Sequence, residues 1–111
     1  MSTGINNHIS EELNNGIKIL GDAWILCIIG TLAKKDLRFN EIQRSVESIN
    51  PTTLANRLKR LEKEKMVSRQ EETVDKLSVV YSLTDKGRRI LPILKQIQIF
   101  AYKNLQTKKS K

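Results

Sequence analysis

The stretch NPTTLANRLKRLEKEK, residues 50–65, predicts a helix with one apolar face and one polar face. Asn50 is a favoured N-cap residue, and Pro51 suits the first helical position because its missing N–H would have no partner there in any case. The leucines recur at intervals of four and three residues, at Leu54, Leu58 and Leu61. Since this spacing places them on one face, we expect a helix over about 51–65 that packs through its leucines.

The opposite face of this helix is polar at its start and cationic further along. It carries Thr52, Thr53, Asn56, Lys59, Arg60 and Lys63, with Arg57 at the edge between the two faces. This order suits a helix in the major groove of DNA, because the first turns reach base edges while later cations neutralise phosphates. The alternative for this helix alone is an ordinary amphipathic helix with a solvated charged face.

Three shorter helical segments precede it. Ser10 caps the first, and Gly21 ends it. Asp22 caps the second, whose run over 24–32 is apolar on most sides, so we expect this helix to be central and buried. A third helix begins at about Asn40.

Two strands and a last helix follow. Residues 66–69 and 77–83 favour strands, the second being rich in β-branched residues, and residues 73–76 favour a turn between them. Thr84 caps a final helix that continues to Leu105, and Pro92 inside it predicts a kink. The order of four helices, hairpin and helix predicts a winged helix-turn-helix, mainly α with a small β-hairpin.

The hairpin over about 67–83 is the expected wing. Arg69 and Lys76 are its candidate contacts to DNA, since a cation on a wing can reach a phosphate or a minor groove. A solvated cation is the alternative for both residues. Asp75, Glu71 and Glu72 would repel phosphate, so the wing contact is the weaker part of the prediction.

The charge distribution indicates where a polyanion would bind. The chain has 111 residues and a formal net charge of +8. Residues 56–111 hold fifteen basic and six acidic side chains, whereas residues 1–55 hold five and six. Nucleic acid would therefore meet mainly the second half. The length predicts one domain over 9–106, with a flexible arm over 1–8 and a basic frayed tail over 107–111.

Other classes of function find little support. One His and one Cys cannot supply a four-ligand zinc site, and no cofactor is indicated. An enzyme would need an activated nucleophile or an acid–base pair, but Cys27 lies in the most apolar segment and is expected to be buried and unreactive. A redox role is the alternative for Cys27. No apolar run approaches the roughly 20 residues that span a bilayer, so we expect a cytoplasmic protein. A winged-helix module that binds protein or RNA remains the alternative.

Five segments of the sequence form a familiar ordered set: Gly21-Asp22-Ala23-Trp24, Arg38-Phe39-Asn40-Glu41-Ile42, Leu54 to Glu62, Val80-Tyr81-Ser82-Leu83-Thr84-Asp85-Lys86-Gly87 and Leu91-Pro92-Ile93-Leu94. Together they resemble the HxlR-type winged-helix transcriptional regulators, which are relatives of the MarR regulators. The resemblance covers roughly residues 13–101. This sequence departs from the family in having no Cys between Asn6 and Leu13 and in having Lys65 where a Gly is usual before the first wing strand.

The resemblance implies a homodimer on a pseudo-palindromic operator in double-stranded DNA. Such a dimer would place two recognition helices at half-sites roughly 34 Å apart, or a multiple of that. The first and last helices would form much of the contact, through Ile9, Leu13, Ile17, Leu91, Leu94, Ile97 and Phe100. The resemblance also allows a small-molecule effector, whose chemistry the sequence leaves open.

Overall fold

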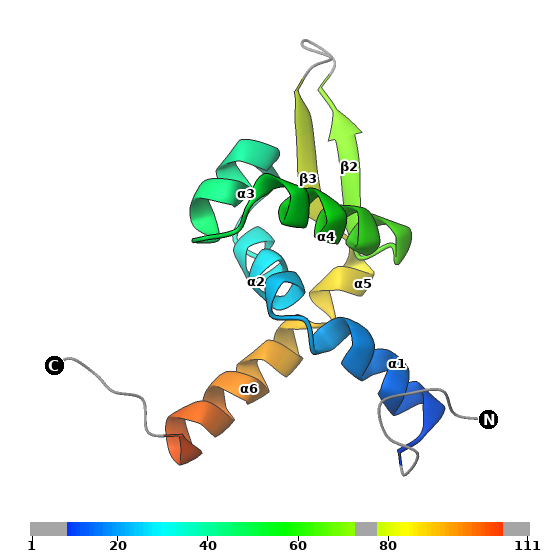
Figure 1. Ribbon diagram of the computed structural model, residues 1–111, viewed down its shortest axis with the longest axis vertical. Coiled ribbons are helices and arrows are strands. Elements are labelled where there is room, and N and C mark those ends of the chain that lie inside the picture. The colour runs from blue at the N-terminus through cyan, green and yellow to red at the C-terminus, as the bar shows by residue number, and fades with distance from the viewer. Residues whose placement is uncertain (1–8, 73–77, 106–111) are drawn as a thin grey trace, which may run out of the picture.

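The computed structural model describes residues 9–72 and 78–105 and confirms the winged helix-turn-helix (Figure 1). The expected arm over 1–8, the wing turn over 73–76 and the tail over 107–111 lie outside these residues. The elements in chain order are α1 (Glu11–Leu20), α2 (Ala23–Leu32), β1 (Leu37–Arg38), α3 (Phe39–Ser45), α4 (Pro51–Lys63), β2 (Val67–Glu71), β3 (Val79–Leu83), α5 (Asp85–Arg88) and α6 (Leu91–Asn104).

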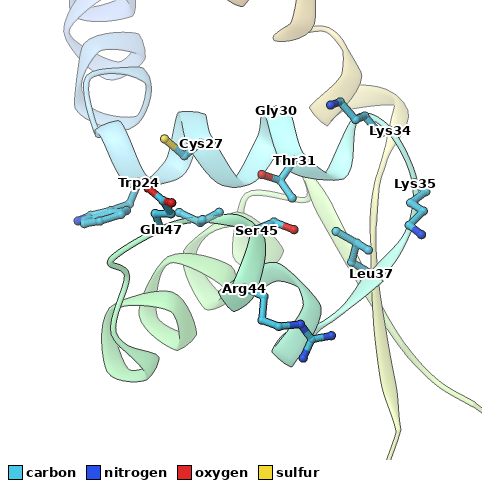
Figure 2. A pocket seen from close by; sticks show the side chains of 11 residues that line it. Trp24, Cys27, Gly30, Thr31, Lys34, Lys35, Leu37, Arg44, Ser45 and Glu47 are labelled. Carbon is cyan, nitrogen blue, oxygen red and sulfur yellow. The ribbon is translucent and has the colours of Figure 1, made fainter.

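Helix α2 is central, as its composition predicts. It contacts α1, α3, α4, α6 and β3, and Ile28, Ile29 and Leu32 are completely buried. The expectation that Cys27 is buried is wrong, because its side chain is exposed beside Trp24 and Thr31 (Figure 2). The isoleucines of α2 face the core. Trp24, Cys27 and Thr31, spaced by three and four residues, lie on another side of the helix, where Cys27 is exposed and the other two are half-buried.

The sheet has three antiparallel strands in the order β1-β3-β2. Strand β2 pairs with β3 over its whole length, from Val67 opposite Leu83 to Glu71 opposite Val79, which confirms the hairpin. Strand β1 was not predicted, because two residues are too few to show an alternating pattern. It pairs with the middle strand through Leu37 opposite Tyr81 and thereby attaches α3 to the wing.

The expected single helix with a kink at Pro92 is wrong. The chain forms the short helix α5 and then starts α6, and Pro92 lies in the first turn of α6. Proline is favoured there because the N–H that it lacks would have no helical acceptor. The turn between the helices is closed by bonds from the N–H of Ile90 to the carbonyl of Gly87 and from the N–H of Ile93 to the carbonyl of Ile90.

Helix α4 ends two residues before the predicted end. The N–H of Met66 donates to the carbonyl of Leu61, and the N–H of Lys65 donates to that of Glu62. This pair of bonds is the Schellman motif, which requires a left-handed residue after the C-cap. Lys65 takes that conformation, with a φ of 63°. The motif turns the chain sharply from α4 into the wing strand β2.

Helices α1 and α6 extend to the side opposite α4 and the wing (Figure 1). Among the described helices, none is by itself long and apolar enough to cross a membrane, and α1 with α2 meets that test only as a pair bent by 71°.

Candidate nucleic-acid interface

Helix α4 presents the two faces that its sequence predicts. Leu54 and Leu61 are completely buried, and Leu58 is nearly so. The cap forms as expected, because Oδ1 of Asn50 accepts a hydrogen bond from the N–H of Thr53 at 2.8 Å. The outward face is exposed along the helix, at Thr52, Asn56, Lys59, Arg60 and Lys63, while Thr53 and Arg57 are half-buried. The side chains that could contact DNA are therefore held outward by a fixed leucine face.

Arg57 is held by an acidic partner from another helix. Its Nε donates to Oδ2 of Asp22 at 2.9 Å. The other oxygen of the same carboxylate accepts from the N–H of Ile25 at 3.0 Å and caps α2. Arg57 therefore joins α4 to α2, a role that its position between the two faces did not predict.

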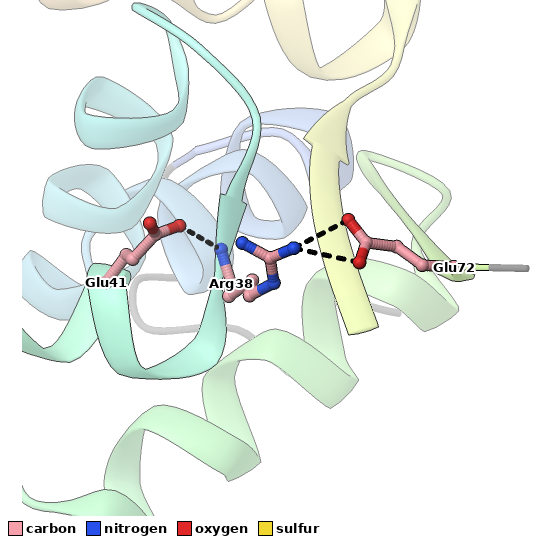
Figure 3. A network of polar contacts seen from close by, with 3 residues as sticks. All are labelled: Arg38, Glu41 and Glu72. Carbon is pink, nitrogen blue, oxygen red and sulfur yellow. Dashed lines mark hydrogen bonds and ion pairs between the residues drawn. The ribbon is translucent and has the colours of Figure 1, made fainter. Parts of the chain in front are cut away.

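Arg38 connects α3 to the wing (Figure 3). Its Nη2 lies 2.8 Å from both carboxylate oxygens of Glu72, just beyond the end of β2. Its backbone N–H donates to Oε1 of Glu41 at 2.8 Å, and this bond holds the pKa of the Glu41 carboxyl below its usual value. Sequence reasoning missed Arg38 as a site residue, because its pairing with Glu72 spans 34 residues of the chain.

A second cation lies near Arg38 on the same side. Arg38 and Arg69 both line a hollow of about 350 Å³ between α3 and the wing, together with Asn40 and Tyr81. Arg69 is exposed on β2, and none of the ion pairs within 9–72 and 78–105 involves it. A hollow lined by two arginines between a helix-turn-helix and its wing suits a backbone phosphate.

The other predicted DNA contacts differ in whether an acidic side chain lies near them. Arg60 has a distant acidic neighbour, with its Nε 3.9 Å from Oε2 of Glu64 one turn later. Lys59 and Lys63 are exposed on the same helix, and the described residues give neither an ion pair. Lys76, the expected wing-tip cation, lies outside the described residues.

The predicted dimer residues lie on α1 and α6, except Ile9, which precedes the cap of α1, and their exposure differs. Four of them are exposed: Leu13 by 50%, Ile17 by 36%, Ile97 by 49% and Phe100 by 57%. Leu91 and Leu94 are half-buried against the core of their own chain, and Ile9 is half-buried. Three further apolar side chains of this region are exposed but were not among the predicted dimer residues: Ile93, Tyr102 and Leu105.

No group of three or more metal-ligating side chains occurs within the part of the chain that the structure describes. The arrangement around α4 instead offers hydrogen-bond donors, amides and cations on a convex helix. Such a surface suits recognition of a groove rather than enclosure of a substrate.

The fold, the exposed face of α4 and the adjoining wing agree with the family comparison. Residues 19–109 match the model of the HxlR-like helix-turn-helix family. The chain belongs to this family. It is therefore a helix-turn-helix transcriptional regulator of the MarR-like type and not an enzyme.

Individual relatives support the same assignment. An uncharacterised HTH-type transcriptional regulator of Halalkalibacterium halodurans, BH0655, is 37% identical over 89 residues, which are 79% of each chain. The regulator YvaP of Bacillus subtilis is 35% identical over 95 residues, covering 86% of this chain and 88% of YvaP. The reduced form of YodB from Bacillus subtilis has a similar structure, with a TM-score of 0.80 at 28% identity over 91% of this chain and 99% of YodB.

Proposed function

We propose that this HxlR-type regulator binds a pseudo-palindromic operator as a homodimer, with α4 of each protomer in the major groove. The observation that carries the proposal is the exposed polar and cationic face of α4 above three buried leucines. Thr52 and Asn56, in the first turns, are placed to contact base edges. Lys59, Arg60 and Lys63 follow and are placed to contact bases or phosphates.

The wing and α3 supply the proposed backbone contacts. Arg69, which lines the hollow beside α3, is the proposed phosphate contact on β2. Lys76, which lies outside the described residues, is proposed as a second contact from the wing on the sequence alone. Arg38 lies beside Arg69 but carries Glu72, so its charge is largely neutralised in the free protein. Arg57 serves mainly to fix α4 on α2, since Asp22 occupies its Nε.

The homodimer is proposed from the exposed apolar side chains of α1 and α6. Isolated exposed apolar residues are common, but Leu13, Ile17, Ile97 and Phe100 lie on two helices that both extend away from the core (Figure 1). A twofold axis through these helices covers the apolar surface and leaves both copies of α4 free. Two such helices match half-sites about 34 Å apart, or a multiple of that.

The test combines selection of bound sequences with binding measurements on the selected duplex. A single enriched palindromic motif is expected, with affinity that falls by about 10³–10⁵ between 50 and 200 mM salt if 6–10 phosphates are neutralised. Asn56→Ala and Arg60→Ala should relax the motif and each cost roughly 1–3 kcal/mol in binding. Lys95→Ala, which removes an exposed cation from α6, is the matched control and should keep the motif.

The dimer is tested by light scattering and by the same binding assay. Ile97→Asp should give a monomer with weak, half-site binding, whereas Gln96→Asp adds the same charge beside it and should remain dimeric. Enrichment of no duplex motif, or tighter binding of the intact protein to single-stranded or double-stranded RNA, would contradict the proposed function.

A further inference from the structure

Helix α1 lies along one edge of α4. Asp22, two residues after the end of α1, binds Arg57 of α4. Further along α4, a hollow of about 260 Å³ lies between the two helices, and both of them line it: Asn15, Lys18 and Ile19 from α1, with Arg60 and the C-cap Glu64 from α4. The second half of α1 is therefore held beside the second half of α4.

The hollow lies at the border of the exposed face of α4. At 3.6 residues per turn, Arg60 is about 40° around the helix from Asn56, in the exposed face, and about 60° from Arg57, at its edge. Arg60 is exposed, whereas Arg57 is half-buried under Asp22. A cation on the α1 side of the hollow therefore lies next to the surface that we propose enters the major groove.

A helix in the major groove has phosphates on both of its sides. The helix with its side chains is about 10–12 Å across and the groove is about 12 Å wide, so both bordering strands run close beside it. In Figure 1 the wing rises on one side of α4, and α1 lies on the other. The hollow with Arg69 serves the wing side, and the hollow with Lys18 is its counterpart on the α1 side.

The ammonium group of Lys18 is available for such a contact. Its side chain is exposed and takes part in none of the ion pairs within residues 9–72 and 78–105. The acidic side chain of the hollow, Glu64, is paired instead with Arg60, at 3.9 Å between Oε2 and Nε. Lys18 thus differs from Arg38 on the wing side, which already carries a carboxylate at 2.8 Å.

We propose that Lys18 contacts a backbone phosphate of the operator, on the side of α4 opposite the wing. This inference rests on the proposed function and adds α1 to its DNA-binding surface. Lysine binds phosphate as a point charge, and the exposed amide of Asn15, one turn earlier, is a second donor toward the same strand. Phosphate contacts on both sides of α4 fix its orientation in the groove and carry no sequence information.

The proposed contact gives α1 two roles on two faces. Asn15 and Lys18, three residues apart, share one face, whereas Leu13 and Ile17, four residues apart, share the exposed apolar face proposed for pairing. One helix of ten residues would then join the partner protomer to a DNA strand. Pairing of the protomers would set the distance between the two Lys18 contacts together with the distance between the two copies of α4.

Charge variants test the contact on the selected duplex and on a random duplex. Lys18→Gln should make the dependence of log affinity on log salt less steep by about 1 for each protomer bound. It should weaken both duplexes by the same factor and keep the enriched motif. Lys18→Arg keeps the charge and should keep the slope, and Lys95→Gln, which removes an exposed cation from α6, should also keep it. An unchanged slope for Lys18→Gln would overturn the contact.

The salt slope also separates this contact from a purely structural role. Lys18 lies in the last turn of α1, where a cation stabilises the helix through its dipole. Loss of that stabilisation in Lys18→Gln would lower the free energy of unfolding in urea and would leave the salt slope unchanged. A protein that is less stable but has the slope of the original chain would therefore contradict the proposal.

A tethered cleavage reagent locates the contact directly. The chain has one cysteine, Cys27, which is exposed, so Cys27→Ser provides the background for a new single cysteine. Iron–EDTA attached to Lys18→Cys should cut the strands that border the groove occupied by α4, and the same reagent on Lys95→Cys should leave the operator intact. Absence of cutting from position 18 in a protein that still binds the operator would overturn this contact alone. Failure of the unmodified protein to bind any duplex would overturn the proposed function as well.

Discussion

Asp22 binds Arg57 and caps α2 with the same carboxylate. Oδ2 lies 2.9 Å from Nε of Arg57 on α4, and Oδ1 accepts a hydrogen bond from the N–H of Ile25 at 3.0 Å. Because the cap fixes the carboxylate on α2, the ion pair fixes the position of α4 relative to the core. The same side chain therefore contributes to stability and to the geometry of the proposed DNA contact.

Substitutions of Asp22 should separate these two roles. Asp22→Ala removes the cap and the ion pair and should lower the free energy of unfolding by about 1–2 kcal/mol. Asp22→Asn keeps a good cap and removes only the charge, so its loss should stay below about 1 kcal/mol, as for a half-exposed ion pair. Urea denaturation measures the free energy of unfolding of the two variants.

Ser10→Ala is the matched control for the cap. Oγ of Ser10 accepts the N–H of Leu13 at the start of α1, far along the chain from α4. Ser10→Ala should lower the free energy of unfolding by a similar amount and leave the affinity for the operator unchanged. Asp22→Ala should change both the free energy of unfolding and the affinity for the operator. An Asp22→Asn protein as unstable as Asp22→Ala would show that the cap is not the main contribution.

Release of Arg38 should strengthen general DNA binding. Glu72→Gln removes the carboxylate that holds the guanidinium and one repelling charge beside the wing. The affinity for random duplex should rise, and the slope of log affinity against log salt should steepen by about 1, the effect of one added phosphate contact. Fluorescence anisotropy across a salt series measures both.

Glu71→Gln provides the comparison for this change. Glu71 is an exposed neighbour on β2 and takes part in none of the described ion pairs, so its replacement removes a charge without freeing an arginine. Glu71→Gln should raise the affinity for random duplex less than Glu72→Gln does, and it should leave the slope of log affinity against log salt nearly unchanged. Equal effects from the two variants would show that the removed charge alone matters and that Arg38 does not reach DNA.

Replacing Lys65, the left-handed residue after α4, with glycine should stabilise the protein. Lys65 has a φ of 63°, and a residue with a Cβ is strained there by roughly 1–2 kcal/mol. Lys65→Gly should therefore raise the free energy of unfolding by about 1 kcal/mol, since the strain exceeds the entropy lost on ordering glycine. Lys65→Ala removes the charge and keeps the strain, so thermal unfolding should show no gain for that variant.

Two glycines should respond in opposite directions to alanine. A Cβ at Gly87 would overlap the backbone carbonyl of Met66, so Gly87→Ala must separate α5 from the base of the wing. A loss of about 1–3 kcal/mol is expected, as for other overpacked sites. At Gly16 in α1 nothing lies within 4 Å of an added Cβ, and Gly16→Ala should stabilise the helix by about 0.5–1 kcal/mol. Similar changes at both positions, measured by urea denaturation, would contradict the tight contact.

Much of this fold follows from local patterns in the sequence. Asn50 and Pro51 start α4 where predicted, and its leucines face the core because their spacing allows no other arrangement. The cap residues Ser10, Asp22 and Thr84 all accept the expected backbone N–H groups. These features depend on neighbours within four residues, which a sequence displays directly.

The features that sequence reasoning missed depend on contacts between distant residues. The pairing of β1 with β3 joins Leu37 to Tyr81, and the Arg38–Glu72 ion pair spans a similar distance along the chain. Cys27 lies in an apolar helix, and only the packing of α2 against its neighbours shows that its side of the helix stays open. Of the proposed DNA contacts, sequence analysis identified the exposed face of α4 but not the carboxylate that occupies Arg57.

The placement of the apolar side chains of α1 and α6 opposite α4 has a consequence for gene dosage. In a regulator whose protomers pair through those helices, the amount of paired protein at low abundance grows with the square of the amount synthesised. A twofold rise in expression would then give up to a fourfold rise in operator occupancy. Promoters under its control would respond to small fluctuations in its synthesis more steeply than they would to a repressor that acts alone.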